Sequence, residues 1–76
     1  MEKYEPSEEI IRQILSDKLK IWKNTVYDAG IDAKVAQVTE DDRMLQGAQK
    51  RLKGALKAVA FLEEELNKSQ NGEGGE

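Results

Sequence analysis

The sequence predicts an all-α fold: an antiparallel helical hairpin of two long helices. Helix-forming residues dominate the chain, and it contains a single proline. One stretch also repeats apolar residues at alternating spacings of three and four, the pattern of a helix that packs along a heptad seam. The positions of this seam are Leu45, Ala48, Leu52, Ala55, Val59, Leu62 and Leu66.

The first helix is expected over residues 7–29, after a flexible arm at residues 1–6. Ser7 is the expected N-cap, and Glu8 and Glu9 follow in the first turn, where the helix dipole favours acids. The apolar side chains of this helix fall on a broad arc that covers about half of its circumference. The arc comprises Ile10, Ile11, Ile14, Leu15, Leu19, Ile21, Trp22 and Val26. One neighbouring helix would leave part of this arc uncovered.

A linker is expected over residues 30–39. Gly30 can end the first helix as a C′ residue in a left-handed turn. The linker is expected to be ordered and to close one end of the bundle, because Ile31, Val35 and Val38 recur at helical spacing. A short helical turn within it, capped by Asp32, is left open.

The second helix is expected over residues 40–68. Thr39 begins its start signal, and Asp42 takes the position that a capping box gives to glutamate. Residues 69–76 are polar and glycine-rich, so they are expected to form a disordered tail. Residues 7–68 therefore make one helical hairpin domain.

The unequal helix lengths, about 33 Å against about 43 Å at 1.5 Å per residue, predict an assembly. A lone hairpin would expose the overhang of the second helix and the spare arc of the first, which is unusual in a monomer. A homodimer that forms a four-helix bundle with two-fold symmetry would cover both. The alternative is a monomer in which the linker folds back over the arc.

The seam alternates large residues with alanine, at Ala48 and Ala55. Alanine lets the backbone of a neighbouring helix approach closely, while the leucines and Val59 fill the layers between. In pattern and architecture this layering resembles the Rop family of plasmid regulators, which are RNA-binding dimers of helical hairpins. The resemblance implies a dimeric bundle.

Candidate partner-binding residues lie on a second stripe of the second helix. Gly47, Gly54 and Phe61 are seven residues apart and nearly opposite the seam, with Ala58 alongside. Each interior glycine costs roughly 0.8–1 kcal/mol relative to alanine. Small residues beside an exposed aromatic make a shallow groove that suits another helix. The plainer interpretation is that the glycines are tolerated and Phe61 is an ordinary exposed residue.

Trp22 is a further partner-binding candidate, on the arc of the first helix. As a structural residue it would anchor the bundle core, which is the favoured interpretation. As a functional residue it would be the hot spot of an interface with another protein.

A basic surface on the second helix predicts an alternative function. It comprises the nucleic-acid candidates Arg43, Lys50, Lys53 and Lys57, with Arg51 nearby. No acid occurs between Arg43 and Leu62. Basic side chains beside an exposed aromatic suit contact with phosphates, so an RNA-binding hairpin dimer is the alternative. A solvated helix face that supplies solubility is the plainer interpretation.

The composition argues against an enzyme. The chain has no histidine or cysteine, which excludes a zinc cluster, a thiol nucleophile and an imidazole base. Residues 40–42 and 63–65 are acidic triplets, but consecutive helical residues point about 100° apart and do not converge on one ion. Lys18, within the arc, is expected to extend its ammonium group to the surface rather than act as a base. No cofactor and no metal is expected.

The remaining expectations concern location and role. The longest apolar run, residues 58–62, is far short of the roughly 20 residues that span a bilayer. The chain is small and acidic, with a net charge of −3, and its lack of cysteine fits a reducing, cytoplasmic location. The sequence therefore predicts a small accessory or regulatory protein, a non-catalytic protein–protein interaction module that acts through a homodimeric bundle.

Overall fold

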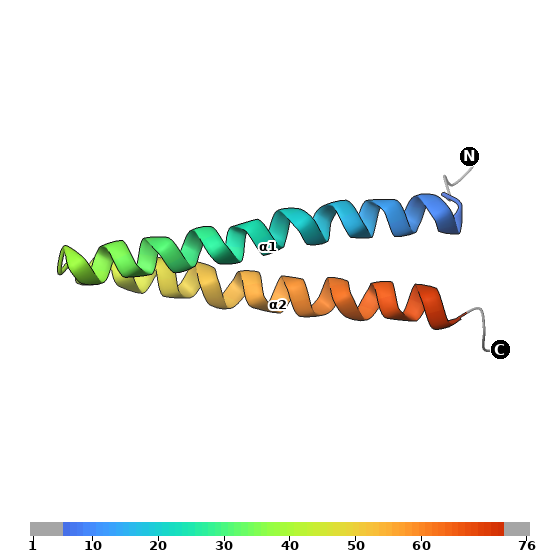
Figure 1. The fold of residues 1–76 in the computed structure, drawn as a ribbon. Helices are drawn as coiled ribbons and strands as arrows, with labels where there is room; N and C mark the ends of the chain where they lie inside the picture. The colour runs from blue at the N-terminus through green and yellow to red at the C-terminus, as the bar shows by residue number, and fades with distance from the viewer. Residues whose placement is uncertain (1–5, 73–76) are drawn as a thin grey trace, which may run out of the picture.

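The computed structural model describes residues 6–72 and shows two long helices side by side (Figure 1). Helix α1 spans Glu8–Val38 and helix α2 spans Asp42–Gly72. They pack against each other, and no strand occurs in this part of the chain. The predicted all-α hairpin is confirmed. The flexible arm was predicted for residues 1–6, of which 1–5 lie outside the described residues.

The predicted start of the first helix is confirmed. The Ser7 hydroxyl accepts a hydrogen bond from the Ile10 backbone N–H at 3.2 Å, as an N-cap does. Glu8 and Glu9 occupy the first turn.

The predicted end of the first helix is wrong. Helix α1 passes through Gly30 and continues to Val38, so the predicted linker over residues 30–39 is the last part of a helix of 31 residues. Gly30 does not adopt a left-handed conformation. A glycine in a helix costs only about 1 kcal/mol. Burial of Ala29 and Ala36 on either side, both strong helix formers, outweighs that cost.

The turn between the helices is short and is capped from both sides. The sequence predicts that Thr39 begins the second helix. In the structure the Thr39 hydroxyl instead donates to the Val35 carbonyl at 2.9 Å and ends α1. The Asp41 carboxylate accepts from the Met44 backbone N–H at 3.0 Å and is the cap of α2. Glu40 between them has φ of 58°, the left-handed conformation that reverses the chain.

Helix α2 extends beyond its predicted end at Lys68 to Gly72. Residues 69–72 of the predicted tail are therefore helical, and residues 73–76 lie outside the described residues. Because both helices contain 31 residues, the predicted difference in length is wrong. The prediction that a linker folds back over the arc is also wrong, because residues 30–38 continue α1 as a helix.

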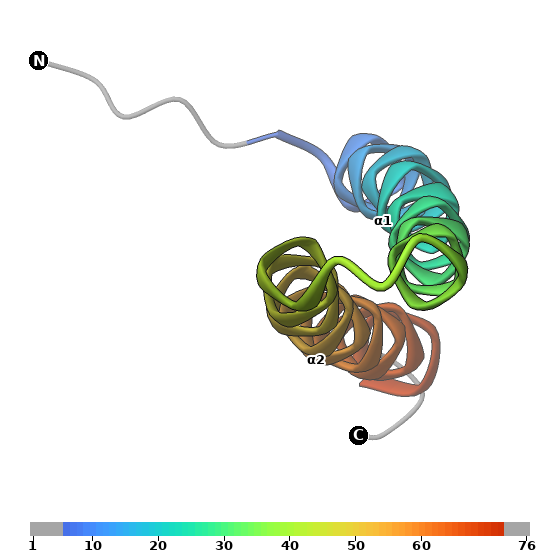
Figure 2. The same cartoon turned by 90° about the vertical axis from the view of Figure 1, so that its left-hand side faces the viewer.

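The α2 seam faces α1 throughout. Ala48, Ala55 and Leu62 are buried, and the other seam residues are half-buried: Leu45, Leu52, Val59 and Leu66. The matching seam of α1 has the same alternating spacing of three and four: Leu15, Leu19, Trp22, Val26, Ala29, Ala33 and Ala36. Alanines occupy its half near the turn and larger residues its other half. The helices accordingly lie close at the turn and draw apart toward the termini (Figures 1 and 2).

Candidate protein-interaction surfaces

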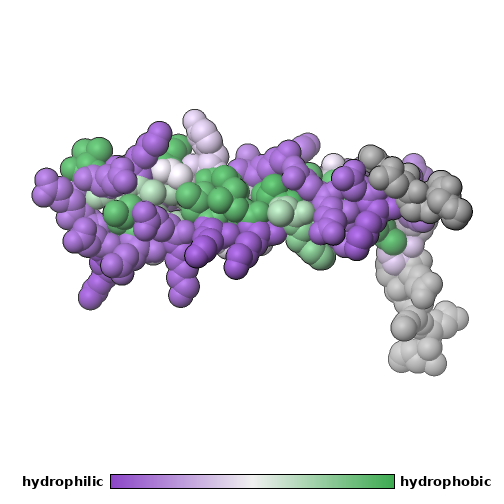
Figure 3. Space-filling model, turned by 90° about the horizontal axis from the view of Figure 1, so that it is seen from below, coloured by the Kyte–Doolittle hydropathy of each residue, from purple (hydrophilic) through white to green (hydrophobic). Residues whose placement is uncertain are grey.

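The apolar arc of α1 is only partly covered by α2. Leu15, Leu19 and Val26 are half-buried in the seam, and Trp22 keeps 38% of its surface exposed. Four isoleucines of the arc are exposed by 38–60%: Ile10, Ile11, Ile14 and Ile21. The side of the hairpin that faces down in Figure 1 also exposes apolar side chains, which stand along its middle between hydrophilic ones (Figure 3). A two-helix hairpin thus leaves apolar surface of the kind that usually marks a contact site.

Two ion pairs identify one side of the hairpin, here called the arginine flank. Arg51 of α2 reaches across to α1 and binds Asp32 at 3.0 Å through Nη1 and Asp28 through Nη2. Residues that continue from these three in alternating steps of three and four along each helix lie on the same flank. On α1 they are Ile11, Ile14, Lys18, Ile21, Thr25 and Val35, and on α2 they are Met44, Gly47, Gly54, Ala58, Phe61, Glu65 and Lys68.

The two aspartates hold Arg51 firmly in its charged form. Hydrogen bonds from the guanidinium to Asp32 and then to Asp28 raise the pKa of Arg51 above its ordinary value. Sequence reasoning placed Arg51 beside the nucleic-acid candidates, but the structure engages it within the hairpin. Its partners lie 19 and 23 residues away in the chain, beyond any local sequence signal.

The predicted stripe of small residues lies on the arginine flank. Gly47 and Gly54 are exposed, and a Cβ built on either one meets no atom within 4 Å. Packing against α1 therefore gives no reason for these glycines. Phe61 is 58% exposed, and Ala58 beside it is half-buried. Trp22 does not belong to this stripe, because it lies in the α1 seam.

The opposite side, here called the lysine flank, is identified by the ion pair between Lys23 of α1 and Glu63 of α2 at 3.7 Å. Alternating steps of three and four along each helix assign to it Lys20, Tyr27, Gly30 and Lys34 of α1, and Gln49, Lys53, Leu56 and Ala60 of α2. Among these residues the flank carries several lysines and one acid, Glu63. The two flanks therefore differ in charge: the arginine flank mixes both signs and the lysine flank is basic.

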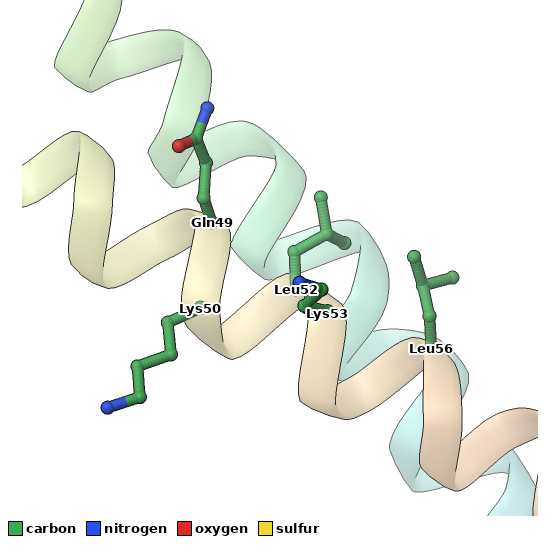
Figure 4. A pocket seen from close by; sticks show the side chains of 5 residues that line it. All are labelled: Gln49, Lys50, Leu52, Lys53 and Leu56. Carbon is green, nitrogen blue, oxygen red and sulfur yellow. The ribbon is translucent and has the colours of Figure 1, made fainter.

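Two adjoining hollows lie on the lysine flank and share Leu52. One, of about 470 Å³, is lined by Gln49, Lys50, Leu52, Lys53 and Leu56 (Figure 4). In Figure 4, Gln49, Leu52 and Leu56 project toward one side of α2, whereas Lys50 projects away from them. The second hollow, of about 290 Å³, is lined by Val26, Tyr27, Gly30, Ile31, Lys34 and Leu52. The surface that these two hollows cover, joined at Leu52, is here called the lysine-flank groove.

Sequence reasoning missed the α1 side of this groove. The sequence predicts that residues 30–34 belong to the linker, so it does not indicate a helical surface there. The available signal was Tyr27, Ile31 and Lys34, which recur at the spacing of one helix face.

The nucleic-acid candidates Arg43, Lys50, Lys53 and Lys57 are all exposed. None of them takes part in the ion pairs found among the described residues. Lys53 turns toward the lysine flank, and the others follow the outer side of α2.

No family model, no curated protein and no solved structure matches this chain. Within residues 6–72, no three acidic, histidine or cysteine side chains are grouped to hold a metal ion. In this part of the chain, neither helix is long and apolar enough to cross a membrane.

Proposed function

We propose that this chain is a non-catalytic protein–protein interaction module that acts as a homodimer, in which two hairpins pack into a four-helix bundle. The observation that carries the proposal is the apolar surface that α2 leaves uncovered on the arginine flank. Ile21 is 60% exposed and Phe61 is 58% exposed, and both belong to this flank. A second hairpin laid against the flank would bury these side chains, and their removal from water stabilises association.

The charges of the arginine flank support contact with a second copy. Lys18 lies among the isoleucines of the flank, where a charge needs an opposite charge once it is covered. A two-fold axis perpendicular to the helices, level with residue 23, would bring it toward Asp28 of the second copy. An axis parallel to the helices would bring it toward Glu65. In both of these arrangements Lys18 would meet an acid, which supports contact between two arginine flanks.

The dimer is tested by sedimentation velocity across a wide range of protein concentrations. We expect a species of twice the 8.6 kDa chain mass at tens of micromolar. Ile21→Asp places a carboxylate in the apolar interface, and we expect it to weaken dimerisation at least tenfold, on the order of 1.4 kcal/mol or more. The matched control is Leu56→Asp, which adds the same charge on the lysine flank and leaves the dimer intact. A single 8.6 kDa species of the unsubstituted chain would overturn the proposal.

An RNA-binding dimer is the second candidate, supported by the exposed and unpaired basic side chains of α2. In a gel-shift titration with structured RNA, this function requires a complex that weakens steeply as salt is raised, because phosphate contacts release counterions. The variant Lys50→Gln with Lys57→Gln removes two of these charges and should abolish the shift. No shift at low salt eliminates this candidate.

A further inference from the structure

We infer that the lysine-flank groove binds an acidic amphipathic helix of a partner protein. The inference rests on the proposed role as a protein-interaction module, but it does not depend on the dimer. It names both the surface and the chemistry of the partner.

The groove has the lining of a helix-binding site, with apolar side chains from both helices. Leu52 and Leu56 project side by side from α2 (Figure 4), and Tyr27 and Ile31 stand on the α1 side. Tyr27, Ile31 and Leu56 are 74%, 46% and 51% exposed, so their apolar surface is open to a partner. Gly30 lies between the two α1 side chains, and a Cβ there would meet no atom within 4 Å, which leaves the α1 wall notched.

The dimensions of the groove limit the occupant. The lining residues cover about two helical turns on each helix, or roughly 11 Å along the axis. An amphipathic helix fits this length with apolar anchors at positions i, i+3 or i+4, and i+7. An extended nucleic-acid strand would instead need phosphate-spaced charges along the floor, which here is apolar.

The lysines beside the groove favour a partner helix that carries acidic residues. Lys34 borders the groove on α1 and Lys53 borders it on α2, so acids that flank the apolar anchors of an entering helix would meet a lysine on either side. Lys50 and Lys57, on the outer side of α2, add a positive field that accelerates the encounter with an acidic partner. Two lysine flanks would repel each other, which argues that the occupant is not a second copy of this chain.

The test is a selection from a library of random 16-residue peptides displayed against the full chain. We expect enriched peptides to be net acidic and to carry apolar residues at helical spacing. By fluorescence anisotropy, Leu56→Asp should weaken a selected peptide at least tenfold, and the effect of Lys34→Glu with Lys53→Glu should diminish as salt is raised. Ile21→Asp, which alters the arginine flank, should leave peptide affinity unchanged.

Several outcomes would overturn the inference. These are the absence of any enriched acidic amphipathic class, enrichment of basic peptides, or peptide binding that Ile21→Asp abolishes and Leu56→Asp does not. Binding of a random RNA pool that is lost in the Lys34→Glu, Lys53→Glu variant would assign the lysine flank to nucleic acid instead. Sedimentation of the same variants reports the dimer separately, so failure of the groove and failure of the dimer are distinguishable.

Discussion

Ala55→Leu is expected to destabilise the hairpin by about 1–3 kcal/mol, the usual effect of overpacking a filled core. Ala55 is 1% exposed and lies in the α2 seam, where the small side chain lets α1 approach closely. Three additional carbons would force the helices apart and reduce contact in the neighbouring layers. The loss is large for a small domain, whose total stability is on the order of 5 kcal/mol.

Urea unfolding followed by circular dichroism measures the effect, at one fixed protein concentration because dimerisation would shift the midpoint. Ala60→Leu is the matched control, since Ala60 is exposed on α2 and the same enlargement there should change stability by no more than about 0.5 kcal/mol. Equal stability of the Ala55→Leu variant and the original chain would show that the seam is loosely packed.

The α2 seam is the part of the fold that the sequence predicts best. Each of its positions, from Leu45 to Leu66, is buried or half-buried in the structure. Heptad spacing identifies the face of a helix that packs against a neighbour, so this face can be predicted without knowing which helix the neighbour is. Ser7 was predicted equally well, because an N-cap acts through hydrogen bonds within its own turn.

Gly30 shows why the end of α1 could not be predicted. A glycine followed by a mixed apolar and polar segment is a common way to end a helix. Keeping a glycine inside a helix costs about 1 kcal/mol, and here the burial of Ala29 and Ala36 against α2 opposes that cost. That burial depends on contacts with residues far along the chain, so the local sequence does not contain the deciding quantity.

The same limit applies to the candidate surfaces. The sequence identified an apolar arc too wide for one neighbour, but not which part of it α2 would cover. The rotation of α1 about its axis decides that Leu19 is half-buried while Ile21 is 60% exposed. The lysine-flank groove needs residues from both helices, since Leu52 joins its two halves. Neither surface exists before the helices pack.

The double variant Gly47→Ala, Gly54→Ala is expected to stabilise each hairpin by nearly 2 kcal/mol. Alanine is favoured over glycine in a helix interior by about 0.8–1 kcal/mol, mainly because the unfolded chain loses less conformational entropy. Neither position has a left-handed backbone, and an added Cβ meets no atom within 4 Å. The methyl groups therefore cost nothing within one hairpin, and thermal unfolding at a concentration where the chain is monomeric should show a higher Tm.

The two glycines lie on the arginine flank, so the same variant separates folding from assembly. If a second copy packs closely there, the added methyl groups lie in the interface and dimerisation should weaken even as each hairpin becomes more stable. Gly30→Ala is the control, because it should give a similar gain per residue on the lysine flank without changing the dimer. A Tm that stays constant or falls in both variants would contradict the helical environment of these glycines. A higher Tm with an unchanged dimer would place the interface away from Gly47 and Gly54 and confine it to the isoleucines of α1.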